Sequence, residues 1–285
     1  MKFLVLSLSV VMVMISCKKE TDPSPTPGSR EESRLNVSYG ADAAQKFDYY
    51  LPANRSTANT KVLILVHGGG WSQGDKSDFY PLMDTLKKRL PGYAIFNINY
   101  RLSNGSSNLF PSQEMDLKVA LTYIFNKRSE YLISEKFVLV GTSAGAHLSL
   151  LQAYKYAEPV KIKAVVDFFG PTDLVDMYNN PASILAPPAL LSSVIGGTPV
   201  THPLMYSHSS PVTYVTNQAP PTIILHGGLD PVVSPNQSVL LRDLLLSAGV
   251  THEFVLYPGE LHGWSGASLV HSFDRIQAFL QANVQ

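Results

Sequence analysis

The sequence predicts an α/β fold, a mostly parallel and twisted sheet with helices on both faces. Two observations lead to this prediction. Strand-like and helix-like segments alternate along the chain from residue 35 onward, and several strand-like segments are apolar on both sides, as strands between two helical layers are. The chain has 285 residues, 45% of them hydrophobic, which is enough for one domain with a large buried core.

Hydrophobic periodicity and local start and stop signals place the elements in order. The apolar run 61–66 predicts a strand buried on both faces, and apolar residues on one side of 78–90 predict a helix. Pro111 and Ser112 start the next helix, and Gly249 stops a later one. The expected strands are 36–39, 46–51, 61–66, 93–100, 136–140, 162–169, 221–225 and 252–257, and the expected helices are 78–90, 112–126, 144–156, 235–247 and 269–282.

The composition limits the classes of partner. The chain has 22 Lys and Arg and 22 Asp and Glu, so its formal net charge is zero, which indicates neither a nucleic-acid-binding face nor a polybasic membrane patch. The one cysteine, Cys17, allows no intrachain disulfide, and no Cys/His cluster offers a metal site. We therefore expect no metal and no organic cofactor.

The start of the chain resembles a bacterial lipoprotein signal. Lys2 supplies a positive charge, residues 3–15 are an apolar run too short for an ordinary membrane helix, and Ser16 stands directly before Cys17. In such signals the cysteine is lipidated, which implies a lipid-anchored protein of the bacterial cell envelope, with the anchor as its only membrane contact. Met14 stands where these signals usually carry Leu, and an ordinary secretory signal is the alternative.

The predicted organisation follows from these segments. Residues 1–17 are a lipoprotein-type signal peptide, and 18–34, which begin with a segment rich in Pro, Ser, Thr and charge, are a flexible tether. Residues 35–285 are a single catalytic domain. Within it, 171–219 contain many prolines and are too long for a plain loop, so we expect a small, cap-like helical insertion before the last two strands.

The pattern Gly-Thr-Ser-Ala-Gly at residues 141–145 follows a predicted strand and opens a predicted helix. Alone, Gly-x-Ser-x-Gly is a weak signal. At a strand-to-helix turn it is typical of the nucleophile elbow of the α/β-hydrolase fold, which holds a serine in a strained, exposed turn. The N-terminus of the helix also places the positive end of the helix dipole near a developing oxyanion. We therefore predict that Ser143 is a nucleophile.

A serine hydroxyl needs a base, and in this fold an acid and then a histidine follow the nucleophile on loops after later strands. Asp230 follows the strand 221–225, and His262 follows the last strand. This placement predicts a Ser143–His262–Asp230 triad. Asp167 and Asp173, near the end of an earlier strand, stay open as alternatives for the acid.

The other candidates lack this placement. Glu260 is too close to His262 in sequence to orient its ring from behind, and His147 lies one helical turn beyond Ser143 on a side that leans away from it. We expect structural roles for His226 and His252, and the sequence assigns none to His202, His208 and His271.

The run His67-Gly68-Gly69-Gly70-Trp71 comes directly after the strand 61–66. Acyl transfer needs preorganised donors for its oxyanion, and glycines let backbone N–H groups approach without a Cβ in the way. We expect Gly69, Gly70 and Ala144 to form the oxyanion hole, and His67 to hold the loop. Trp71 either contacts substrate or packs under the loop.

Together with Asn99-Tyr100-Arg101-Leu102-Ser103 and His226-Gly227-Gly228-Leu229-Asp230, these motifs make the chain resemble the bacterial carboxylesterases of the hormone-sensitive-lipase-like type, and more narrowly the bifunctional acetylxylan and feruloyl esterases. The resemblance covers roughly residues 47–280. One departure is Thr142, where the hormone-sensitive-lipase type has Asp. The resemblance implies a serine hydrolase that cleaves small-molecule or glycan-linked esters, and we expect a preference for acetyl to butyryl groups.

Other functions share this fold and remain open. An aryl formamidase or a peptidase would use the same triad, although the chain has no room for the propeller domain of prolyl-oligopeptidase-like enzymes. A noncatalytic, surface-tethered binding protein typically loses a triad member, whereas all three residues are present here.

Overall fold

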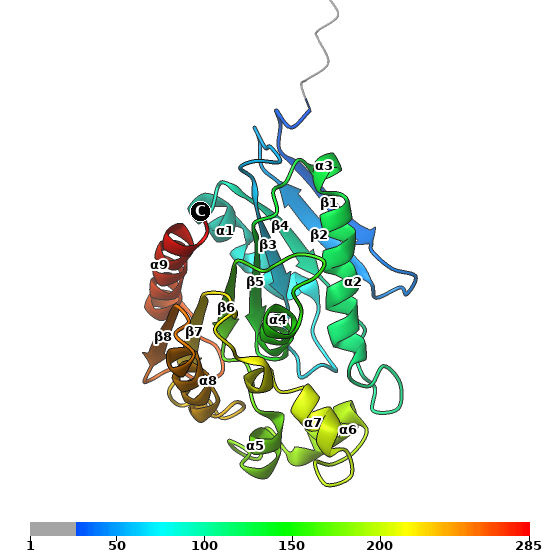
Figure 1. Ribbon diagram of the computed structural model, residues 1–285, viewed down its shortest axis with the longest axis vertical. Coiled ribbons are helices and arrows are strands. Elements are labelled where there is room, and N and C mark those ends of the chain that lie inside the picture. Colours follow the sequence, from blue (N-terminus) through cyan, green and yellow to red (C-terminus); the bar gives the residue numbers. More distant parts are fainter. Residues whose placement is uncertain (1–26) are drawn as a thin grey trace, which may run out of the picture.

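The computed structural model describes residues 27–285, so Cys17 and the expected signal peptide lie outside the described residues. Eight strands within this range form one sheet in the order β1-β2-β4-β3-β5-β6-β7-β8 (Figure 1). From β4 to β8 neighbouring strands are parallel, and the antiparallel pairs are β1–β2 and β2–β4. The strands are β1 (Glu32–Ser38), β2 (Lys46–Leu51), β3 (Lys61–Val66), β4 (Tyr93–Ile98), β5 (Phe137–Thr142), β6 (Ala164–Phe168), β7 (Thr222–Gly227) and β8 (His252–Tyr257).

Helices cover both faces of this sheet, as the alternating pattern predicted (Figure 1). One face packs against α2 (Ser112–Asn126), α4 (Ala144–Lys155) and α8 (Pro235–Ser247). The other face packs against the 3₁₀ helix η1 (Lys76–Leu82), α1 (Met83–Arg89) and α9 (Gly266–Asn283). Within residues 27–285, no helix combines the length and the apolar character needed to cross a membrane.

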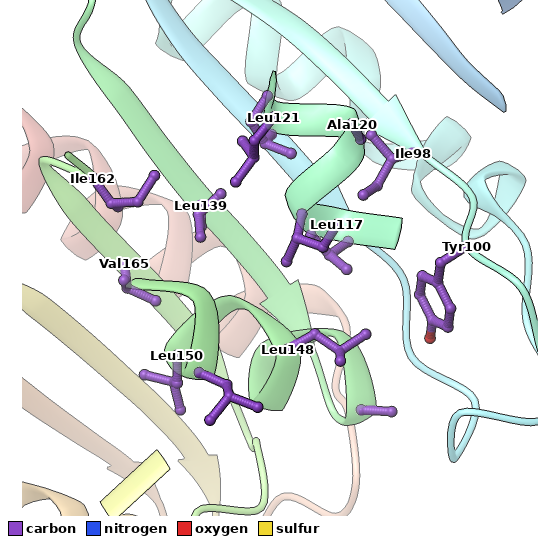
Figure 2. Close-up of a cluster of buried hydrophobic side chains, with 14 of the residues drawn as sticks. Ile98, Tyr100, Leu117, Ala120, Leu121, Leu139, Leu148, Leu150, Ile162 and Val165 are labelled. Atoms are coloured by element: carbon purple, nitrogen blue, oxygen red, sulfur yellow. The ribbon is translucent and has the colours of Figure 1, made fainter. Parts of the chain in front are cut away.

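The central parallel strands are buried because their side chains alternate between two apolar layers. On β5, Leu139 belongs to the layer beneath α2 and α4, and Val140 belongs to the layer beneath α1 and α9. Figure 2 shows side chains of α2 and α4, among them Leu117 and Leu148, gathered around Leu139. Fully burying a side chain of this size stabilises the fold by roughly 1.5–3 kcal/mol, so the two layers hold the sheet in place.

Several element boundaries differ from the expected ones. β1 begins at Glu32, which pairs with Leu51, so 32–34 belong to the sheet and not to the tether. The expected helix over 78–90 is divided into η1 and α1 because Pro81 has no N–H to donate to the helical ladder. A short helix α3 (Arg128–Tyr131) was not expected.

The segment 171–219 is helical, as expected, and lies at the end of the sheet where the parallel strands terminate (Figure 1). Its base is fastened to the core, since Ser209 O accepts a hydrogen bond from His147 Nε2 on α4 at 2.6 Å, and Gln237 Oε1 on α8 accepts one from the Thr172 N–H at 2.8 Å. The segment contains α5 (Leu174–Asn179), α6 (Pro188–Ile195), α7 (Pro203–His208) and the 3₁₀ helix η2 (Pro211–Tyr214).

Helix α4 approaches the end of β3 so closely that its second residue has no space for a side chain. A Cβ on Gly145 would lie 2.1 Å from the carbonyl oxygen of Val66 and 2.4 Å from that of His67. Both obstacles are backbone atoms, which cannot rotate away. Gly145 therefore sets the distance between the start of α4 and the loop that follows β3.

This contact predicts that Gly145→Ala lowers the free energy of unfolding by about 1–3 kcal/mol or more, because the added methyl must push backbone apart. Thermal unfolding followed by circular dichroism measures the effect. Gly92→Ala is the matched control, since a Cβ there meets no heavy atom within 4 Å, and we expect a change within about 0.5 kcal/mol. Equal midpoints for the two variants would contradict the close approach.

Candidate active site

Ser143 lies at the sharp turn between β5 and α4. Its backbone has φ 53° and ψ −121°, a region that residues with a side chain rarely adopt. The turn is held by hydrogen bonds on both sides, from the Ser143 N–H to Phe168 O at 2.8 Å and from the His147 N–H to Ser143 O at 3.0 Å. The surrounding structure thus compensates the strain and presents the side chain beyond the end of the sheet.

Three residues that are distant in sequence form one hydrogen-bonded row here. His262 Nε2 lies 3.0 Å from Ser143 Oγ, and His262 Nδ1 lies 2.7 Å from Asp230 Oδ2. They come from the turns that follow β5, β8 and β7, as the order of motifs predicted. An imidazole that donates from Nδ1 to the carboxylate leaves Nε2 free to accept the serine proton.

The Asp230 carboxylate is buried and ionised. Burial alone would raise its pKa, but hydrogen bonds from His226 and His262 and from the Val233 N–H hold the pKa of Asp230 below its usual 3.8. Its Oδ1 accepts the N–H groups of Val232 and Val233 at 2.8 and 2.9 Å. The negative charge behind His262 is therefore fixed in position and in protonation state.

His226 contributes to this arrangement more directly than the sequence indicated. Its ring is fully buried, with Nε2 3.2 Å from Asp230 Oδ2 and 2.9 Å from Val233 O. Its Nδ1 lies 2.7 Å from Ser238 Oγ on α8. His226 thus fastens the Asp230 loop to α8, a structural role that supports the row.

The glycine run after β3 forms a tight turn beside Ser143. Gly69 O accepts the N–H groups of Ser72 and Gln73, and Gly69 and Gly70 have φ 105° and 57°, conformations that glycine adopts without strain. Within residues 27–285, the N–H groups of Gly69, Gly70 and Ala144 donate to no protein acceptor. Gly69 and Gly70 line a cleft of about 470 Å³ together with Ser143 and His262.

His67 supports this turn, as expected, and is not part of the hydrogen-bonded row. Its ring stacks on Tyr100 with centroids 4.3 Å apart, and its Nδ1 lies 2.7 Å from Gly68 O. Tyr100 Oη donates to His67 O at 2.9 Å. The ring and the backbone of His67 are therefore both engaged in holding the loop.

Trp71 packs beneath the glycine turn, which is the second of its two expected roles. Its side chain is 2% exposed, and its indole N–H donates to His147 Nδ1 at 3.1 Å. Burial lowers the pKa of His147 to about 4, so this ring is neutral and its Nε2–H donates to Ser209 O at 2.6 Å. Trp71 also borders the cleft, so its other expected role, contact with substrate, stays a prediction.

The alternative acids are engaged elsewhere. Asp173 caps α5 by accepting the Val175 and Asp176 N–H groups at 2.9 and 3.0 Å, and Glu260 accepts a hydrogen bond from Ser268 at 2.6 Å. Asp167, on β6, accepts the Gly170 N–H at 2.8 Å. Among the described residues, only Asp230 supplies a carboxylate to His262.

Phe169 is a residue of this site that the sequence did not indicate. It has φ 46°, which is strained for a bulky residue, and its ring centroid lies 4.5 Å from that of His262. The cleft also receives side chains from the insertion, Met177 and Leu190. No periodicity marks these positions, since backbone strain and the docking of the insertion appear only in three dimensions.

Asp167 is a buried carboxyl with one unpaired oxygen. Burial raises its pKa from 3.8 to about 7, which the Gly170 N–H and nearby His226 offset only in part. Between about pH 4 and 7 the folded chain therefore keeps a proton that the unfolded chain releases. The free energy of unfolding consequently falls as pH rises through this window.

Asp167→Asn removes this titration. The free energy of unfolding of the variant, relative to that of the wild type, should therefore increase from pH 5 to pH 8. The gain is up to a few kcal/mol, at roughly 1.4 kcal/mol per unit of pKa shift. Urea unfolding at both pH values, with Asp173→Asn as the control at the partly buried cap of α5, measures the difference. The same pH dependence in wild type and Asp167→Asn would show that Asp167 is ionised in the fold.

The fold agrees with comparisons to known proteins. A solved structure described as a truncated form of a carbohydrate esterase from gut microbiota superposes with a TM-score of 0.76 and 26% identity, covering 90% of this chain and 98% of that one. Esterase LipQ of Mycobacterium tuberculosis is 30% identical over 74% of this chain and 52% of its own length. Esterase LipC of the same organism is 27% identical over 81% of this chain and 60% of its own length.

The chain thus spans about half the length of LipQ and somewhat more of LipC. These similarities confirm the predicted α/β-hydrolase fold and the predicted resemblance to bacterial esterases. The model of the BD-FAE family matches residues 47–245, which include Ser143 and Asp230. The chain therefore belongs to the BD-FAE family of α/β-hydrolase-fold proteins.

Proposed function

We propose that this protein is a serine carboxylesterase that hydrolyses acyl esters through an acyl-enzyme intermediate. The observation that carries the proposal is the hydrogen-bonded row from Ser143 through His262 to Asp230, at the wall of an open cleft. Unengaged N–H groups beside the nucleophile supply the second requirement for acyl transfer. The names of the similar esterases support the same reaction class.

In the first step, Ser143 Oγ attacks the ester carbonyl carbon while His262 Nε2 accepts the hydroxyl proton. The carbonyl oxygen becomes an oxyanion, for which the N–H groups of Gly69, Gly70 and Ala144 are the donors. The buried Asp230 carboxylate keeps the imidazole in its donating tautomer and stabilises the imidazolium.

Collapse of the tetrahedral intermediate breaks the bond between the carbonyl carbon and the leaving oxygen. His262 gives its proton to that oxygen, the alcohol departs, and the acyl group stays on Ser143. Water then enters, loses a proton to His262 and attacks the acyl carbon. The acid is released, and the proton returns to Ser143 Oγ.

For the substrate, we propose short acyl groups such as acetyl, or feruloyl groups, carried on glycans. Similarity to a carbohydrate esterase supports a sugar alcohol, and the cleft of about 470 Å³ lies within the 300–1,000 Å³ range of ligand sites. An aryl formamide is the second candidate, because the same row of residues would cleave its amide bond.

Ser143→Ala should lower kcat/KM for chromogenic acetate esters at least about 10³-fold, because it removes the nucleophile. Asp230→Asn should lower it roughly 10⁴-fold, because it removes the charge that holds the His262 tautomer and stabilises the imidazolium. Initial rates across a panel of esters, aryl formamides, acetylated xylan and feruloylated xylan measure this effect. Asp243→Asn, whose side chain is exposed on α8, is the control and should stay within about threefold of wild type.

Undiminished ester hydrolysis by Ser143→Ala would refute the mechanism. A wild-type preference for formamides over every ester, with the same dependence on Ser143, would retain the mechanism and replace the substrate class. Hydrolysis of neither class would favour a noncatalytic binding protein.

We further propose that the protein is anchored in the bacterial cell envelope through a lipid on Cys17, which precedes the described residues. The apolar run before this cysteine and the polar segment after it support the proposal. Cells fed a radioactive fatty acid should label the wild-type protein, and Cys17→Ala should lose the label. Equal labelling of both would rule out Cys17 as the acceptor.

A further inference from the structure

A second cavity, of about 220 Å³, lies in the apolar layer between the sheet and the helices η1, α1 and α9. Its floor includes Leu63 of β3 and Val140 of β5, and its helical walls include Leu86 of α1 and Phe273 of α9. These residues belong to the core layer opposite α2 and α4. The hydrolytic mechanism above makes no use of this space.

This cavity adjoins the catalytic cleft. Asp78, Thr142 and Phe169 border both volumes. Thr142 directly precedes Ser143, and Gly263, which borders the second cavity, directly follows His262. The second cavity therefore begins within one residue of both the nucleophile and the base.

The lining suits an apolar group. Besides Asp78 and Thr142, the residues that line the cavity are apolar, and several carry aromatic rings. The indole N–H of Trp264, which could otherwise be a polar group in the wall, donates to Ser272 Oγ at 2.9 Å. Asp78 is exposed and its carboxylate accepts the Asp75 N–H, which places its charge at the margin.

Size and polarity decide which part of an ester fits. An apolar cavity of about 150 Å³ in another protein binds benzene, so about 220 Å³ has room for a ring or a chain of similar volume. A sugar alcohol would lose its hydrogen bonds to water here and find few replacements, which is unfavourable. The wider, more polar cleft beside Gly69 and Gly70 suits the alcohol better.

Phe169 forms the shared wall and is held rigidly. Its N–H donates to Leu225 O at 2.9 Å, and the Gly170 N–H donates to Asp167 Oδ1 at 2.8 Å. These bonds fix a left-handed backbone at Phe169, φ 46°, and keep its ring 4.5 Å from the His262 ring and 5.5 Å from the Trp264 ring. The ring thus borders both the reacting atoms and the apolar space.

We propose that this cavity is an acyl-binding subsite, which takes the apolar part of the acyl group, a ring or a chain of about six carbons, past Thr142 and Phe169. The inference rests on the proposed ester hydrolysis. It extends the expected acetyl-to-butyryl range to longer chains, and it gives the ring of a feruloyl group a binding site.

The test compares p-nitrophenyl acetate, hexanoate and 3-phenylpropenoate on the full chain. Wild type should show a higher kcat/KM for hexanoate, for the phenylpropenoate, or for both, than for acetate. Leu269 lies on α9 and lines the cavity, so Leu269→Trp should fill the space. We expect this variant to lower the kcat/KM for hexanoate or the phenylpropenoate, divided by that for acetate, at least about tenfold. Each ratio is taken within one variant, so the fraction of folded protein cancels.

Val270→Trp is the matched control, because Val270 is the next residue on the same helix and is 53% exposed. It should keep the wild-type ratios. A loss confined to hexanoate identifies a chain site, and a loss confined to the phenylpropenoate identifies a ring site. An unchanged ratio in Leu269→Trp, or equal losses for all three esters, would overturn the subsite while leaving ester hydrolysis in place. No hydrolysis of any ester by wild type would overturn both proposals.

Discussion

The strained backbone of Ser143 is the constraint on which the site depends. A φ of 53° at a residue with a side chain costs free energy, on the order of 1–3 kcal/mol, and persists only where the surroundings determine it. Here β6 supplies the acceptor for the Ser143 N–H, and Gly145 lets α4 approach the end of β3. The same close approach brings the glycine turn after β3 next to Ser143, so nucleophile and oxyanion donors are positioned by one packing arrangement.

Two networks of buried polar contacts then support the reacting atoms. One runs from His226 to Asp230 and His262 and keeps a carboxylate ionised where burial would favour its neutral form. The other runs from Trp71 through neutral His147 to Ser209, which ties the oxyanion loop to the base of the insertion. Since each network uses a histidine that takes no part in the proposed mechanism, the number of histidines overstates the number of candidate bases.

Sequence reasoning could predict the elements whose signals are local. The strand 252–257 and the helices 112–126 and 235–247 have the expected boundaries, because periodicity and proline start signals define them. The grouping of Ser143, His262 and Asp230 was also predictable, since topology dictates which loops meet at the ends of parallel strands. The division at Pro81 and the early start of β1 at Glu32 were missed, because they depend on local backbone geometry and on pairing with Leu51. Phe169 and the cavity behind it carry no local signal, because they arise where residues of β3, β5, α1 and α9 pack together.

The most direct measurement of the central claim is mass spectrometry of the protein quenched in acid during turnover of p-nitrophenyl acetate. The account predicts one added acetyl group on the peptide that contains Ser143, and prompt loss of that group when the substrate is exhausted. Continued hydrolysis with no acylated Ser143, or with the acetyl group on another residue, would contradict the account.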